Sequence, residues 1–229
     1  MVTAERFGKG MTFDEYLTYT ASPENLAREA SGAGRSPGWK EFMRTAYDAA
    51  QLSEPHRAAW RWLVEQPGGP ARVLAISEEW SSDCRRDIPL IAKIAQVVGL
   101  ELRIFPRDGR RFSASPEPDA ESPNADLMGR YLNRRDGQTF QSIPVIVFFA
   151  RDMRELYRYI EFPMVYRKDR LRAVQTAAQP GETTEQTKQR AAREFGEMLS
   201  SPFFQVWRDA AGAEWLSMLY ERLRVGSLP

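Results

Sequence analysis

Apolar and polar positions along the chain predict strands and helices in turn. The apolar residues of 71–77 predict a strand, and those of 82–98 predict a helix. Residues 100–105 predict a second strand, with Gly99 supplying the turn before it. The order strand, helix, strand predicts parallel pairing through a right-handed crossover. We therefore expect the centre of the chain to fold as an α/β unit.

Two further apolar segments, at 144–149 and 154–160, predict an antiparallel hairpin. The second segment alternates less cleanly, so we expect it at the edge of the sheet. Residues 107–124 contain a glycine, three prolines, serines and charges of both signs, which favours a loop. A short helix is expected after this loop, over 125–134.

Helices are predicted at both ends of the chain. Thr12 and Glu15 match a capping box, and the pairs Ser22-Pro23 and Ser36-Pro37 are each typical of a helix start. Further helices are predicted over 53–66, 184–199 and 203–223.

The length and charge of the chain fit one domain with extensions. A chain of 229 residues can bury one good core. We expect a helical extension at 1–52, a central domain at 53–200, and a C-terminal helix at 201–229 packed on that domain. The 32 basic and 31 acidic residues give no global field that favours nucleic acid or an anionic membrane.

Targeting signals are not evident in the sequence. Residues 1–6 lack the apolar core of a secretory signal, and the longest apolar run, 145–150, is too short to span a bilayer. The chain has one cysteine, so no disulfide can form within it, and a reducing compartment is favoured. We expect a cytoplasmic protein with no nucleic-acid or membrane partner and no cofactor; the oligomeric state stays open.

That one cysteine, Cys84, lies in the first turn of the predicted helix, directly after the first strand. Residues three apart share a helix face, so Ser81 and Cys84 can meet at the helix N-terminus. Two cysteines at this spacing would form the Cys-x-x-Cys unit of disulfide exchange. Here serine stands at the first of the two positions.

The segment Trp80-Ser81-Ser82-Asp83-Cys84 resembles the Trp-Cys-x-x-Cys active site of thioredoxin-like proteins. Pro89 matches the proline that kinks the active-site helix of this family, and Ile143-Pro144 resembles its second proline, which is usually cis. Residues 7–16 resemble a bacterial branch with a helical N-terminal extension.

The resemblance covers about residues 55–200 and implies a thioredoxin-like α/β fold with extra N-terminal and C-terminal helices. It also implies that Ser81 and Cys84 occupy the catalytic positions. A protein or peptide partner would then bind in a groove beside Trp80, Asp83, Ile143 and Pro144.

Ser81 cannot perform the chemistry of the thiol that the family carries at its position. A serine hydroxyl forms no disulfide, and its alkoxide needs an adjacent base near neutral pH. The single histidine, His56, lies in an upstream predicted helix with no motif linking it to Ser81. The structural interpretation of Ser81 is a helix N-cap for a backbone donor at residue 83 or 84.

Cys84 has two interpretations. It is either a small buried apolar residue or a reactive thiol, because Ser-x-x-Cys is similar in spacing to the Thr-x-x-Cys of peroxiredoxins. The proline that precedes that threonine has no counterpart at residues 77–80. Burial would raise the pKa of the thiol, whereas the helix N-terminus, Arg85 and Arg86 would lower it, and we expect these effects nearly to cancel.

Other side chains suggest structure more than chemistry. Trp60 is expected in the core and Trp62 at the surface, and Trp207 with Trp215 predicts a buried stripe. The basic residues of 107–111 are expected to be solvated. Three nearby carboxylates suggest a divalent cation, but the sequence offers no further ligand cluster, so no metal site is predicted; they are Glu78, Glu79 and Asp83.

Three functions remain open. The first is a thioredoxin-like protein of disulfide-oxidoreductase lineage that has lost dithiol exchange, either as a natural variant or because a cysteine was replaced to give Ser81. The second is a one-cysteine redox enzyme that acts through Cys84 on peroxide, glutathione or a protein disulfide. The third is an interaction module without catalysis. Fold alone does not choose among them, because function belongs to the site.

Overall fold

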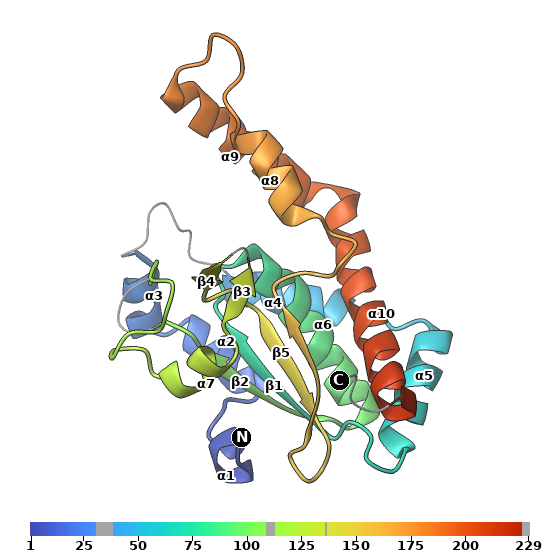
Figure 1. Ribbon diagram of the computed structural model, residues 1–229. Helices are drawn as coiled ribbons and strands as arrows, with labels where there is room; N and C mark the ends of the chain where they lie inside the picture. The colour runs from blue at the N-terminus through green and yellow to red at the C-terminus, as the bar shows by residue number, and fades with distance from the viewer. Residues whose placement is uncertain (31–38, 109–112, 136, 226–229) are drawn as a thin grey trace.

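The computed structural model describes residues 1–30, 39–108, 113–135 and 137–225. A four-stranded sheet lies at the centre, with helices on both sides (Figure 1). Its strands, in the order β2-β1-β5-β6, are Glu101–Pro106, Arg72–Ser77, Val145–Phe149 and Glu155–Ile160. The first two strands pair in parallel, and β5 and β6 are antiparallel to their neighbours. Both predicted pairings and the edge position of β6 are confirmed.

Helix α6 (Ser82–Val98) connects β1 to β2 and carries the motif cysteine in its first turn. Most of its residues are buried, because the helix packs on the sheet on one side and under neighbouring helices on the other. It ends at Gly99, whose φ of 77° is the left-handed conformation that glycine adopts without steric cost. Pro89 lies inside this helix, as expected.

Among the described residues, five helices lie before β1: α1 (Ala4–Gly8), α2 (Phe13–Thr20), α3 (Pro23–Ala30), α4 (Trp39–Ala49) and α5 (Glu54–Glu65). The capping box of Thr12 and Glu15 is present in both directions, and the Ser22 hydroxyl accepts the Asn25 N–H at 3.2 Å. The predicted start at Ser36-Pro37 lies outside the described residues.

The helix predicted over 125–134 is shorter than expected. Helix α7 (Ala125–Arg130) is followed by a small separate sheet of two antiparallel strands, β3 (Asn133–Arg135) and β4 (Gln138–Phe140). Leu132 and Phe140 point partly into the protein, and this half-buried environment favours strand pairing over a longer helix. The sequence pattern did not predict this hairpin.

In the part of the chain up to Val225, three helices follow β6: α8 (Lys168–Thr176), α9 (Thr184–Ser200) and α10 (Pro202–Val225). Only the last two were predicted. Helices α8 and α9 extend away from the sheet, whereas α10 returns to pack on α5, α6 and β6 (Figure 1). No helix in the described part of the chain is long and apolar enough to cross a membrane.

Aromatic side chains fill the core between the sheet and α10. The ring of Phe148 lies 5.9 Å from that of Trp60 and 6.2 Å from that of Trp215, and both tryptophans are fully buried. Trp62, which was expected at the surface, is half-buried. Trp207 departs from the predicted buried stripe, because it is partly exposed and stacks on Tyr166 at 3.8 Å.

Candidate functional site

The motif turn, residues 78–81, connects the end of β1 to the start of α6. Ser81 is the N-cap of the helix: its hydroxyl oxygen accepts the Cys84 backbone N–H at 3.4 Å. An N-cap hydroxyl satisfies one of the backbone donors that a helix leaves free at its first turn. The predicted capping role of Ser81 is therefore confirmed.

Cys84 is completely buried, with 0% of its surface exposed. Its thiol lies among the hydroxyls of Ser77 and Ser81 and the backbone of Glu78, and these polar neighbours favour a thiolate. Burial outweighs them and raises the pKa of Cys84 to about 12. We expected burial and the groups that favour a thiolate to have nearly cancelling effects on the pKa of Cys84. That expectation is wrong, because the effect of burial is the largest.

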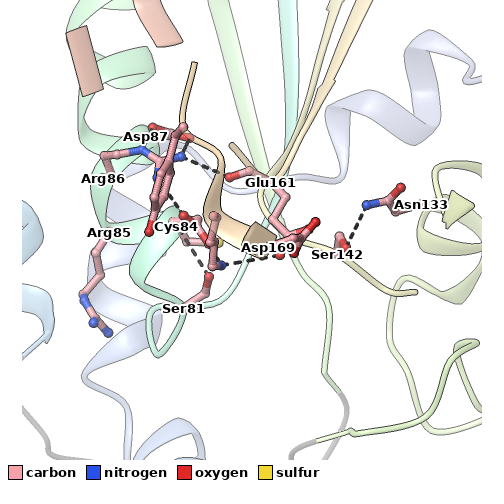
Figure 2. Close-up of polar contacts among 12 residues, drawn as sticks. Ser81, Cys84, Arg85, Arg86, Asp87, Asn133, Ser142, Glu161 and Asp169 are labelled. Atoms are coloured by element: carbon pink, nitrogen blue, oxygen red, sulfur yellow. Dashed lines mark hydrogen bonds and ion pairs between the residues drawn. The ribbon is translucent and has the colours of Figure 1, made fainter. Parts of the chain in front are cut away.

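The two arginines that follow Cys84 serve other groups. The Arg85 guanidinium lies 3.7 Å from the centre of the Trp39 ring and donates to the carbonyls of Glu79 and Trp80. It points away from Cys84 (Figure 2). Arg86 is engaged by carboxylates, so neither guanidinium counteracts the effect of burial on the thiol.

The peptide bond between Ile143 and Pro144 is cis, as the resemblance implied. Ile143 borders the same cleft as Trp80 and Ser81, although these residues are more than 60 positions away in the sequence. Pro144 begins the approach to β5, and its carbonyl oxygen accepts the Glu161 N–H at 2.8 Å. The turn therefore joins the cleft to the edge strand.

The cleft has a volume of about 610 Å³. The motif turn and the first turn of α6 form one wall, through Trp80, Ser81 and Asp83. The segment from β4 to the cis-proline turn forms another wall. The loop residues 113–116 also line the cleft, together with Arg107, Arg135, Glu161 and Lys168, so the cleft presents charged groups of both signs. Cys84 is not exposed to it.

A buried ion pair lies behind the motif. The Arg86 guanidinium donates to both carboxylate oxygens of Asp87, each at 2.7 Å, and both side chains are fully buried. The Tyr159 hydroxyl donates to the same carboxylate at 2.8 Å. Burial raises the pKa of Asp87 to about 6, although Arg86 and Tyr159 act in the opposite direction. This pair ties α6 to the edge strand β6.

Asp83 extends the pair into the cleft. One carboxylate oxygen of Asp83 accepts from Arg86 at 2.6 Å, and the other binds Lys168 of α8. Lys168 also lies 3.4 Å from the carboxylate of Glu161, and the carbonyl of Glu161 accepts from Arg86 at 3.0 Å (Figure 2). Asp83 therefore holds the wall of the cleft in place, through residues distant in the sequence.

The carboxylates of Glu78 and Glu79 are also buried, and both are bound by the N-terminal extension. Arg28 of α3 forms ion pairs with both residues, and Asn25 donates to Glu79. The Asp108 backbone N–H donates to Glu78 at 2.6 Å. Burial raises the pKa of both glutamates. Among the described residues, no group of acidic, histidine or cysteine side chains is arranged to hold a metal ion.

Arg107, the first residue of the basic segment 107–111, is not solvated, contrary to expectation. Arg107 is buried and donates to Asp108 at 2.7 Å, to the Gln141 carbonyl at 2.9 Å and to the Ser113 carbonyl at 2.9 Å. Its guanidinium also lies over the ring of Trp80. Arg107 therefore positions the loop beside the cleft, and Arg110 and Arg111 lie outside the described residues.

The single histidine, His56, contacts Ser53 rather than a residue of the motif. His56 is exposed, and its ring nitrogen contacts the Ser53 hydroxyl at 2.7 Å at the start of α5. Sequence analysis missed Arg86, Asp87, Glu161 and Lys168 as site residues. The adjacent charges Arg86-Asp87, directly before the apolar run of the same helix, were a usable signal, because charged residues at core positions require partners.

Comparison with known proteins supports the fold. A family model described as thioredoxin matches residues 36–116, a range that includes β1, α6 and β2. A search of curated proteins found no match. A solved structure of a protein of unknown function from Pseudomonas aeruginosa aligns with a TM-score of 0.52 and 16% identity, covering 96% of this chain and 98% of that one.

A second solved structure, an HIV epitope scaffold, aligns with a TM-score of 0.52 and 15% identity over the same shares of the two chains. At these identities the likeness concerns the fold alone. The chain has a thioredoxin-like α/β fold with extra helices.

Proposed function

We propose that this protein is a thioredoxin-like protein of disulfide-oxidoreductase lineage that has lost dithiol exchange and uses its cleft to bind an extended peptide. The observation that carries the proposal is the position of the two motif residues. Ser81 lines the cleft, where an attacking thiol would be needed, whereas Cys84 is fully buried beneath it.

Loss of exchange follows from the chemistry of these two groups. A serine hydroxyl forms no disulfide, and a single thiol can at most form a mixed disulfide and then stall. The raised pKa of Cys84, about 12, keeps the thiol protonated at physiological pH, and the thiolate is the nucleophile. The burial of Cys84 and its raised pKa also count against the alternative of a one-cysteine enzyme.

Peptide binding is supported by the shape and edges of the cleft. Its volume of about 610 Å³ is in the range of ligand sites. Trp80 and Phe140 both line the cleft and offer aromatic contacts. Ile143 lies in the cleft wall outside the strand ladders, so an incoming extended chain could pair with its backbone. Binding of this kind needs no thiol.

Two assays test the proposal. The unmodified protein should give no turnover in insulin reduction, whereas Ser81→Cys should form an intramolecular disulfide with Cys84 and gain activity; Ser81→Ala is the matched inactive control. In parallel, selection from a random cysteine-free peptide library displayed on phage should yield binders. Turnover by the unmodified protein would contradict the loss of exchange, and a failure to select any binder would contradict peptide recognition.

A further inference from the structure

One wall of the cleft is a continuous stretch of chain. Six consecutive residues border the cleft, from Gln138 at the start of β4 to Ile143 at the cis-proline turn. Successive side chains of an extended chain point to opposite faces. A cleft over one face would therefore be lined by alternate residues. Here all six residues line the cleft, so the cleft reaches the backbone edge of this segment and not one face alone.

That edge of β4 has no partner strand in the part of the chain that the structure describes. The small sheet contains only β3 and β4, with Arg135 opposite Gln138, and Arg134 opposite Thr139. Two residues connect the strands, so Arg135 and Gln138 form the hydrogen-bonded pair next to the turn. The next pair is non-hydrogen-bonded, and the backbone N–H and C=O of Thr139 therefore face away from β3.

Polar contacts hold the segment in place beyond the end of β4. The Asn133 side chain of β3 donates to the Ser142 hydroxyl at 3.2 Å (Figure 2). This hydrogen bond connects β3 to the segment that follows β4, beyond the last pair of the ladder. The Gln141 carbonyl accepts from buried Arg107, and the Gln141 amide donates to the Ser115 carbonyl at 2.9 Å. These contacts preorganise the segment from Thr139 to Ser142, which lowers the entropic cost of pairing with a ligand.

We propose that the β4 edge is the main recognition element of the cleft, and that the ligand is an extended peptide segment of about six residues that adds to the β3–β4 sheet as a third strand. The inference rests on the proposed function and extends it. Recognition would reach from Ile143 along the whole segment to Gln138, rather than stopping at the cis-proline turn. The occupant must have free backbone N–H groups, so proline is excluded at the pairing positions.

Strand pairing makes a specific demand on the ligand. Backbone groups on one edge of an extended strand recur at every second residue, so a ligand that keeps the register from Thr139 would next meet Gln141 and then Ile143 at the bend before the cis-proline. The Gln141 carbonyl already accepts from Arg107, and we therefore expect the strongest ligand bonds at Thr139 and Ile143. The ligand residues that donate to or accept from these positions are four apart in sequence.

The test uses a peptide selected from the cysteine-free phage library, synthesised with a fluorophore and measured by anisotropy. Single N-methylation at each peptide bond removes one N–H without altering the protein. We expect at least two sensitive positions, two or four residues apart and separated by an insensitive one. Each should lose about tenfold in affinity, the worth of one well-placed hydrogen bond.

Two protein variants sharpen the result. Thr139→Pro removes the outward N–H on the cleft side, and proline is tolerated at such edge positions. It should weaken binding about tenfold, whereas Thr139→Val should not. Arg134→Pro is the matched control, because Arg134 lies opposite Thr139 on the far edge of the same sheet and outside the cleft lining.

Binding that ignores Thr139→Pro, with N-methyl losses confined to one position, would overturn this inference and leave the proposed function standing. Equal losses in Thr139→Pro and Arg134→Pro would also overturn it, because they would report damage to the hairpin alone. If no library peptide binds the unmodified protein, both the inference and the proposed function are overturned.

Discussion

Arg28 of α3 and Glu78 of the motif turn form an ion pair in which a guanidinium nitrogen lies 2.5 Å from a carboxylate oxygen, and both side chains are buried. The two residues are 50 positions apart in the sequence. A charge is costly to bury unless it is paired and hydrogen-bonded. The pair therefore gives the N-terminal extension a structural role: α3 neutralises carboxylates that the motif turn buries at the end of β1.

Replacing this arginine should strongly destabilise the protein. Arg28→Ala leaves Glu78 and Glu79 buried without their cation, and breaking such a pair costs about 3–5 kcal/mol. The measurement is the free energy of unfolding from urea titration. Arg44→Ala is the control, since its pair with Asp14 is exposed and should contribute less than about 1 kcal/mol. Equal effects of the two substitutions would contradict this role of α3.

Asp87 should make the protein lose stability as pH rises. Burial raises the pKa of Asp87 to about 6 in the folded protein, above the ordinary value of 3.8 for an aspartate. Between these two values the folded state binds more protons than the unfolded state, so the free energy of unfolding decreases with increasing pH. Each pKa unit of such a difference corresponds to about 1.4 kcal/mol.

The variant Asp87→Asn isolates this contribution, because the amide does not titrate. We expect the free energy of unfolding of the wild type, relative to Asp87→Asn, to fall as pH is raised from about 4 to about 6. Denaturant titrations of both proteins at several pH values measure the difference. A constant difference, or one that grows with pH, would show that Asp87 titrates in its ordinary range.

The order of strands and the motif helix could be predicted from sequence because their signals are local. Apolar runs bounded by turns predicted β1, β2, β5 and β6 to within about two residues, the usual uncertainty at element ends. The β3–β4 hairpin escaped prediction, since each strand has only three residues and no alternation is visible over so short a length. Helix α8 escaped for a different reason: it has no buried residues, so it shows no clear apolar stripe.

Within the site, the N-cap of Ser81 followed from a local pattern, and the cis-proline turn followed from the resemblance to thioredoxin-like proteins. The pairing of Arg86 and Asp87 with Tyr159 did not, because the tyrosine lies more than 70 positions away. The state of Cys84 could not be predicted either. It depends on how completely neighbouring elements exclude water, and sequence spacing contains no information on that quantity.

The thiol of Cys84 should react slowly in the folded protein. It is fully buried and its pKa is raised to about 12, so both access and thiolate fraction are low. We expect slow reaction with DTNB under native conditions and rapid, complete reaction in denaturant. Fast native labelling with an inflection below about pH 7, under the free-cysteine pKa of about 8.5, would contradict burial and favour the one-cysteine enzyme.

The most direct test of the account is the affinity of a selected cysteine-free peptide for the wild type and for Cys84→Ala. The proposed function requires the cleft to bind without a thiol. Cys84 lies beneath the cleft rather than in its lining, so removing its sulfur should leave the affinity unchanged within about twofold, a difference of less than 0.5 kcal/mol by the tenfold-per-1.4 kcal/mol relation. The far-ultraviolet circular dichroism of the two proteins should coincide. Loss of binding in a folded Cys84→Ala protein would contradict the account, because it would make the thiol part of the recognition chemistry.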